Sequence, residues 1–459
     1  MPDVWRQTHD TMNNKTPTLT YTTALPFLVA ALWLGLPLQA HASPFELFGA
    51  GARSSGMSGA GGADTRDPSA TWSNPALLTD PDQSRLTLGF QAVIPDLFID
   101  RAPSSTTDAN GGRNNLLPST SAGITVGGSW RLETDSLPTV AFGALLYVPL
   151  AGTTRLEAVD PATPHFVLYQ SLTDRLSVNA AAAIELWPQR LSMAVGFSGL
   201  VGVSGQSDAL LDTERRKVLR RNFDADVEAQ VAPIAARSWR PHRRLTIGVT
   251  YRGSLAVPYQ LPIEFVFVDG GRLDFFIEGT SLYTPDQFNL AAAWRGPLWS
   301  LMIEATWARW SQAPSPAADV VTFLDNSGLN PDSDEVQRLL EFESIPISAG
   351  FVDTITPKIG VERMLGPHWT VRGGYSLRPT PVPNQVGYSN FLDHHAHQLS
   401  LGATWRGGRK LGIGPVSAFV QCTLLQTRHT NKDPERDVLG IGDHDSGGVI
   451  WNQGLEVAW

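Results

Sequence analysis

The chain has little of three features that would assign it to a common class. Its 459 residues include one cysteine, Cys422, so no intramolecular disulfide can form. Beyond the N-terminal region, no run approaches the ~20 apolar residues of a membrane-spanning helix. Charged residues are only 17% of the chain, against roughly 25% in soluble domains. The formal net charge of −9 argues against a nucleic-acid partner.

Short segments of alternating apolar and polar residues recur along the chain. Every second side chain is apolar between Leu245 and Arg252, and between Phe223 and Val231 the polar positions are acidic. A period of two predicts a β-strand with two unlike faces. Many such strands, apolar outside and polar inside, are typical of a barrel in lipid. A barrel that exposes half of each strand to lipid also explains the shortage of charge.

The alternation predicts about fourteen strands whose connections are short and long in turn. We place them at residues 85–95, 121–132, 138–149, 173–187, 190–204, 222–238, 243–257, 284–295, 298–311, 352–364, 368–379, 395–406, 411–428 and 446–459. Short turns on one rim and long loops on the other are typical of outer-membrane barrels. The predicted fold is therefore all-β: a 14-stranded antiparallel transmembrane β-barrel. An extra hairpin near 263–278 would make sixteen strands, and this alternative stays open.

Tryptophans gather where the predicted strands meet the short turns. The residues in question are Trp130, Trp187, Trp239, Trp294, Trp299, Trp369, Trp405 and Trp459. Aromatic rings prefer the lipid–water interface, so this clustering favours a barrel rim over the core of a soluble sandwich. The last five residues alternate and end on Trp459, which resembles the C-terminal strand signal read by the barrel-assembly machinery. We therefore expect that machinery as a partner.

The N-terminus has the features of a secretory signal. An apolar run from Ala24 to Leu38 precedes the small-x-small site Ala40-His41-Ala42. We expect residues 1–42 to be removed, so that the mature chain begins at Ser43. Translation starts at Met1 or at Met12, and the sequence does not decide between them.

The segment 43–84 differs from the strands in composition. A Gly/Ala/Ser-rich stretch runs from Gly49 to Ala63, and Ser73-Asn74-Pro75-Ala76-Leu77-Leu78 follows. No strand precedes Gly49-Ala50-Gly51 and no Gly-Lys-Ser/Thr follows, so a nucleotide site is not indicated. Small residues instead let a compact plug pack tightly inside a barrel.

A signal peptide, a Gly/Ala-rich segment and an Asn-Pro-Ala motif before the first strand resemble the FadL/TodX/OmpP1 family. The family consists of outer-membrane channels for long-chain fatty acids and other hydrophobic molecules. The resemblance implies a hatch at 43–84 inside the lumen of a barrel at 85–459, in the outer membrane of a Gram-negative bacterium. It implies passive uptake through a loop-lined outer groove, a pocket near the hatch and a lateral opening in the wall.

The resemblance also suggests site residues. Asn74, Pro75 and Ala76 match the hatch motif, and Ser43, Pro44 and Phe45, with Leu47 and Phe48, fall near the ligand pocket. A ligand carboxylate would need a basic partner, and the sequence does not choose among Arg53, Arg66, Arg252 and others.

The third predicted strand carries a possible irregularity. Val140, Phe142 and Ala144 share one parity, whereas Leu145 and Tyr147 take the other around Gly143. A glycine at such a break suggests a bulge or kink, and the resemblance places the wall opening there. The alternative, that Leu145 and Tyr147 are ordinary apolar residues of the lumen, stays open.

No catalytic, metal or cofactor site is predicted. Asp334 to Glu343 has helical spacing and could cover the barrel mouth or be a solvated loop helix. His394, His395 and His397 are close together but are more typical of separate surface histidines than of a zinc site. We expect a monomer in contact with outer-membrane lipid and lipopolysaccharide, with a hydrophobic small molecule as ligand. A general porin and an adhesin are the alternatives.

Overall fold

The computed structural model describes residues 45–80, 85–101, 117–133, 138–150, 161–169, 176–212, 217–267, 272–317, 319–325, 347–407, 414–437 and 441–459. Residues 39–459 form one compact unit. The predicted signal peptide, Ser43, Pro44 and the loop helix predicted from Asp334 to Glu343 lie outside the described residues. In the part that is described, no helix is long and apolar enough to cross a membrane.

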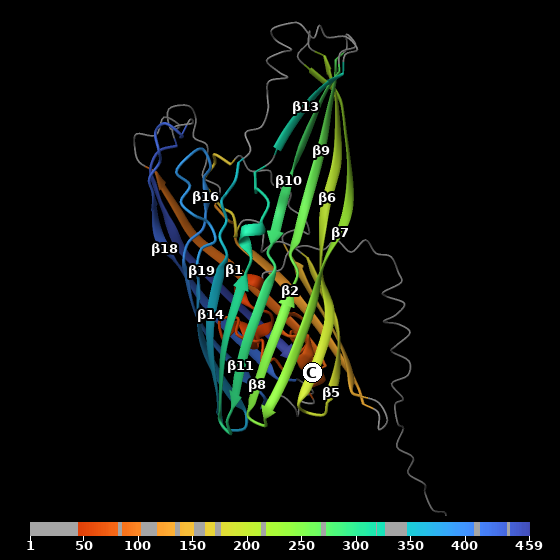
Figure 1. Cartoon of the computed structure of the whole chain (residues 1–459), viewed down its shortest axis with the longest axis vertical. Helices are drawn as coiled ribbons and strands as arrows, with labels where there is room; N and C mark the ends of the chain where they lie inside the picture. Colours follow the sequence, from red (N-terminus) through yellow and green to blue (C-terminus); the bar gives the residue numbers. More distant parts are fainter. Residues whose placement is uncertain are drawn as a thin grey trace, which may run out of the picture. The chain divides into compact units, whose positions relative to one another are not determined.

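Fourteen antiparallel strands of the main sheet close into a ring, because β19 pairs with β1 over the whole length of both (Figure 1). In ring order they are β1 (Leu86–Arg101), β2 (Ser121–Leu132), β3 (Val140–Pro149), β5 (Ser177–Trp187), β6 (Leu191–Asp212), β7 (Lys217–His242), β8 (Leu245–Arg252), β11 (Gln287–Arg295), β12 (Trp299–Ala308), β14 (Thr354–Leu365), β15 (Trp369–Arg378), β17 (Ala396–Trp405), β18 (Val416–Thr430) and β19 (His444–Ala458). Each overlaps one of the fourteen predicted strands, so the predicted barrel is confirmed.

Three further strands of the same sheet lie outside the ring. They are β9 (Leu255–Phe267), β10 (Arg272–Thr284) and β13 (Asp319–Asp325). β9 pairs with β10 and, in parallel, with the far end of β6, while β13 pairs with β10 (Figure 1). The suspected hairpin near 263–278 therefore exists, but it leaves the number of barrel strands at fourteen.

The lengths of β6 and β7 correct the prediction that 205–221 is a long loop. These strands stay paired from Leu191–Trp239 to Asp212–Lys217, far beyond the ~10 residues that cross a membrane. The expected loop at 258–283 is likewise mostly strand, in β9 and β10. A short parallel pair, β4 (His165–Phe166) with β16 (Phe391–Leu392), joins two long connections.

Side chains alternate across the barrel wall as the period of two predicts. In β1, Leu86, Leu88 and Phe90 are exposed on the outer face, whereas Thr87 and Gln91 are buried on the inner face. Seven of the eight rim tryptophans are exposed: Trp130, Trp187, Trp239, Trp294, Trp299, Trp369 and Trp459. Trp405 is half-buried and pairs with Trp369 across β15 and β17. The outside is thus an apolar surface with an aromatic rim, as lipid requires.

The N-terminal segment 45–80 contributes four short helices, drawn in red and orange in Figure 1. They are α2 (Phe45–Phe48), α3 (Gly51–Ser55), α4 (Ala70–Ser73) and the 3-10 helix η2 (Pro75–Thr79). One further 3-10 turn, η4 (Trp310–Gln312), follows β12. Almost every residue of the segment is buried, and it hydrogen-bonds inward-facing residues of β12 and β19. The segment therefore lies among the inner side chains of the ring.

Candidate functional site

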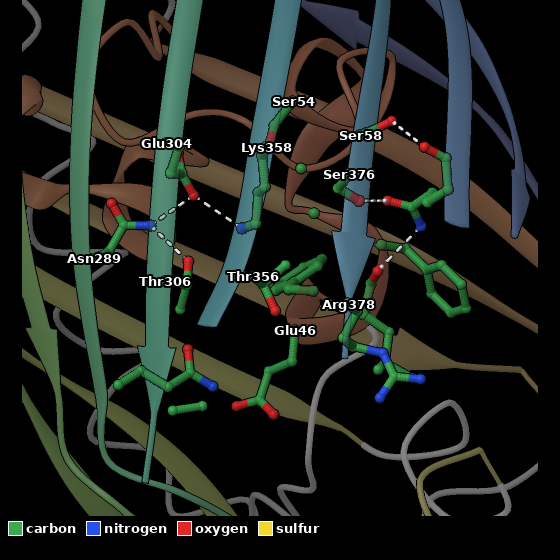
Figure 2. Close-up of a pocket in the computed structure, with 18 of the residues that line it drawn as sticks. Glu46, Ser54, Ser58, Asn289, Glu304, Thr306, Thr356, Lys358, Ser376 and Arg378 are labelled. Carbon is green, nitrogen blue, oxygen red and sulfur yellow. Dashed lines mark hydrogen bonds and ion pairs between the residues drawn. The ribbon is translucent and has the colours of Figure 1, made fainter. Parts of the chain in front are cut away.

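A cavity of about 110 Å³ lies at the long-connection ends of the strands, next to α2, and Figure 2 shows side chains that line it. The N-terminal segment contributes Phe45, Glu46, Leu47, Phe48 and Trp72. The strand ends contribute Arg252, Gln287, Ala308, Thr354, Arg378 and Ala396, and the connections contribute Leu168, Tyr169 and Trp310. Of the residues predicted to bind ligand, Phe45, Leu47 and Phe48 all line this cavity.

Aromatic contacts build the apolar part of the cavity. The ring of Phe45 lies 5.8 Å from that of Trp72 and 5.8 Å from that of Tyr147 on β3. Phe48 belongs to a cluster with Leu168 and Tyr169 of the long connection after β3. Offset and edge-on aromatic pairs of this kind add to the burial of apolar area. The cavity lining therefore joins the N-terminal segment to the outer connections, and Tyr147 of β3 supports it from behind Phe45.

Two glutamines of the barrel hold the end of α2. Gln398 on β17 donates from Nε2 to the carbonyl of Leu47 at 3.2 Å, and Gln421 on β18 donates from Nε2 to the carbonyl of Phe48 at 2.9 Å. The last carbonyls of a helix have no partner within the helix. Because α2 has only four residues, the two glutamines supply the hydrogen-bond donors that its last two carbonyls do not find within the helix.

Most charged side chains around the cavity are paired. Lys358 Nζ lies 2.9 Å from Oε1 of Glu304, and Asn289 Nδ2 donates to the same oxygen at 2.6 Å (Figure 2). Arg378 binds both carboxylate oxygens of Asp393, at 2.9 and 3.0 Å. Paired groups of this kind give the polar side of the cavity a fixed geometry.

The motif Asn74-Pro75-Ala76 starts the 3-10 helix η2. The Oδ1 of Asn74 accepts from the amide of Ala76 at 3.1 Å, and Pro75 takes the first turn of the helix. Asparagine is a favoured N-cap and proline a favoured first residue. The Nδ2 of Asn74 also donates to the carbonyl of Gly62 at 2.7 Å and to that of Arg237 on β7 at 3.3 Å. One side chain thus links the middle of the segment, the start of η2 and the barrel wall.

An ion cluster anchors the segment at the other end of the barrel. Asp64 is fully buried and is bound by Arg53 at 2.9 Å, by Arg66 at 3.1 Å and by Arg295 on β11. Arg53 also pairs with Glu362 on β14 at 3.0 Å. Burial alone would raise the pKa of Asp64, but the three guanidinium groups hold it below its ordinary value.

A second carboxylate of the segment joins the same anchor. Asp80 pairs with Arg240 on β7 at 2.7 Å and lies 3.5 Å from Arg295. Arg53 and Arg66, two of the three arginines named as partners for a ligand carboxylate, are thus engaged away from the cavity. Only Arg252 of those three lines it.

The bulge predicted at Gly143 is wrong. β3 pairs with β2 and with β5 through Gly143 without any shift of register. Ala141, Gly143, Leu145 and Tyr147 all face inward, so the alternative of ordinary lumenal residues is correct. Positions 146 and 148, on the outer face, are apolar too. Because both faces of this part of β3 are apolar, the sequence pattern suggests a change of parity that the strand does not have.

The three close histidines point to different partners. His394 Nε2 lies 3.0 Å from Ser446 Oγ, and His397 Nδ1 lies 2.8 Å from the hydroxyl of Tyr375. His395 Nδ1 accepts from the amide of Thr380 at 3.2 Å. Within the described ranges, no three His, Cys, Asp or Glu side chains come together as metal ligands.

Comparison with known proteins decides the family. A model of the family described as outer membrane protein transport protein (OMPP1/FadL/TodX) matches residues 35–434. The chain belongs to this family. It is therefore an outer-membrane transport protein, and its family is one of channels, not enzymes. No curated protein sequence matches the chain.

Solved structures of family members have the same fold. A Pseudomonas aeruginosa FadL homologue matches with a TM-score of 0.56 and 14% identity, over 89% of this chain and 97% of that one. The Ralstonia pickettii toluene transporter TbuX matches with a TM-score of 0.50 and 15% identity, over 90% and 100%. The Pseudomonas putida toluene transporter TodX matches with a TM-score of 0.50 and 14% identity, over 90% and 98%.

Proposed function

We propose that the chain is a passive channel that takes up a hydrophobic small molecule, with the N-terminal segment 45–80 as its hatch. The observation that carries the proposal is the cavity between α2 and the outer connections. The apolar part of its lining contains Phe45, Leu47, Phe48 and Trp310. An apolar wall with a few placed polar groups is the usual form of a small-molecule site.

The route that we propose begins among the long connections, in a groove that includes Leu168 and Tyr169. Both residues also line the cavity, so a ligand held by them is already beside α2. Each stage must bind well enough to capture the ligand and weakly enough to release it. This requirement suits a chain of apolar contacts better than a single deep pocket.

For release we propose that α2 moves while the ion cluster stays in place. Side-chain hydrogen bonds hold α2, whereas three arginines hold Asp64. The exit would lie between the segment and β3, where the ring of Phe45 packs edge-on against that of Tyr147. A lateral exit spares the ligand the polar inner residues of β12–β19.

Uptake of labelled toluene and labelled oleate by cells that contain or lack the protein tests the proposal. We expect uptake of at least one of them above background, reduced by about tenfold or more when Phe45 and Phe48 are both replaced by alanine. The matched control is Phe90→Ala, because Phe90 is exposed on the outer face. Uptake that the double variant leaves intact would contradict the site, and background uptake of both compounds would favour a general porin or an adhesin.

A further inference from the structure

Two charged side chains at the cavity, Glu46 and Arg252, lack the partners that the other charged groups have. Lys358 and Arg378 each bind a carboxylate. Among the described residues, by contrast, no carboxylate lies within 4.0 Å of Arg252, and the carboxylate of Glu46 has no hydrogen bond or ion pair. In Figure 2 no dashed line reaches Glu46, which lines the cavity.

Arg252 is fixed in place but not neutralised. Its Nη1 donates to Oε1 of Gln287 at 2.9 Å and its Nη2 donates to the carbonyl of Trp72 at 2.6 Å. The guanidinium carbon lies 3.7 Å from the centre of a Trp72 ring, a cation–π arrangement. The buried Nε has no hydrogen-bond partner in the described part of the chain. That atom is inaccessible, but each Nη nitrogen carries a second N–H that these two bonds do not use. The guanidinium group therefore offers donors to the cavity from a rigid support.

Glu46 offers the complementary acceptor. Glu46 lies on α2 between Phe45 and Leu47, so its carboxylate is surrounded by the apolar part of the cavity lining. Burial raises the pKa of Glu46 to about 7, against the opposing charge of Arg252. Arg252 is thus close enough to act on Glu46 electrostatically, although the two form no ion pair.

We propose that this cavity selects hydrophobic molecules that carry one hydroxyl group over carboxylates and plain hydrocarbons of the same length. A hydroxyl can donate to Glu46 and accept from Arg252, so it satisfies both groups at once. Above about pH 7, where Glu46 is ionised, a carboxylate ligand accepts from Arg252 but faces the carboxylate of Glu46, and an ammonium group faces Arg252. Uptake is therefore compared at about pH 8. A hydrocarbon displaces water from both groups and replaces none of its hydrogen bonds.

This inference rests on the proposed uptake function, and a matched ligand series separates the two. We would measure initial uptake of labelled 1-decanol, decanoate and decane at equal free concentration, in cells with and without the protein. One charge-assisted hydrogen bond corresponds to a preference of roughly tenfold, so decanol should exceed the other two by about that factor. Equal uptake of all three, or preference for decanoate, would overturn the inference. Uptake of none of them above background would overturn the proposed function itself.

Two variants of Glu46 test its role directly. Glu46→Gln removes the negative charge but keeps the size, so uptake of decanoate should rise toward that of decanol. Glu46→Asp keeps the acceptor and should keep decanol first. Glu435→Gln is the matched control, because Glu435 is exposed on an outer connection. If Glu46→Gln changes all three uptakes by the same factor, Glu46 does not discriminate and the inference is wrong.

Discussion

The N-terminal segment meets the two sides of the barrel wall through different chemistry. Toward β3–β7, η2 and α4 pack mainly by apolar contact against small side chains: Ala141, Ala181, Ala183, Ala194 and Ala236. Polar bonds to β6 and β7 come from Asn74, Thr79 and Asp80, at the two ends of η2. Toward β12–β19, α2, α3 and the turn after α3 make directed polar bonds to Glu304, Glu362, Gln398, Gln421 and Glu456. We call these sides the apolar wall and the polar wall.

The difference separates two tasks. Apolar contact depends on area and shape and has little directional preference, so the apolar wall holds η2 and α4 close without fixing every atom. Hydrogen bonds and ion pairs depend on distance and angle, so the polar wall fixes where α2 and α3 stand. Three substitutions, one at the ion cluster and one at each wall, would sharpen or break this comparison.

The largest effect is expected from Asp64→Asn. The substitution leaves Arg53, Arg66 and Arg295 without their shared carboxylate, and breaking a buried ion pair costs about 3–5 kcal/mol. The segment should leave the lumen more often, and ion conductance through the protein in planar bilayers should rise strongly. Asp100→Asn is the control, because Asp100 is exposed on β1. Equal conductance of the two variants would mean that the ion cluster does not hold the segment.

An intermediate effect is expected from Gly143→Ala on the apolar wall. A Cβ at this position would lie 2.8 Å from Cδ1 of Leu78 and would also contact Thr71. Overpacking of this kind costs about 1–3 kcal/mol, so amide hydrogen exchange across residues 70–79 should become faster. The control is Gly89→Ala, which faces inward with its nearest atom at 3.5 Å. Unchanged exchange would show that the apolar wall accommodates the added methyl group without loosening α4 and η2.

The smallest effect is expected from Gln398→Leu on the polar wall. Of the side-chain bonds of Gln398, those to Ser376 and Thr423 stay within the barrel wall, and the one to the carbonyl of Leu47 holds the segment. That bond is worth about 1 kcal/mol net, and the ion cluster stays intact. Exchange should become faster at residues 45–49 and remain unchanged at residues 70–79. Gln426→Leu serves as the control, since Gln426 is exposed. Faster exchange across the whole segment would contradict the separation into two walls.

Much of the fold could be predicted because strand alternation is a local property. Leu245 to Arg252 carries its period of two in eight residues, and the rim tryptophans mark where strands end. The extension of β6 and β7 past the ring could not be predicted in the same way, because its far end pairs in parallel with β9, a contact between residues distant in sequence.

The site was predictable only in part, for a similar reason. Phe45, Leu47 and Phe48 were placed near the pocket by resemblance to a family, and they do line the cavity. Glu46 and Gln398 carry no local signal, because a glutamate beside phenylalanines and a glutamine in a strand are both common. Glu46 acts together with Arg252, and Gln398 bonds the carbonyl of Leu47. Each of these partners is distant in the chain from the residue that it meets.

The small inner residues of the barrel have a consequence for engineering. Along β2 the inward positions are Ser121, Gly123, Thr125, Gly127 and Ser129, and a Cβ at Gly127 would lie 2.7 Å from Pro68. The inner face of β2 therefore fits this particular N-terminal segment closely. An N-terminal segment taken from a related channel would not fit the inner surface of these strands. Chimaeras should therefore exchange the segment together with β2 and β3.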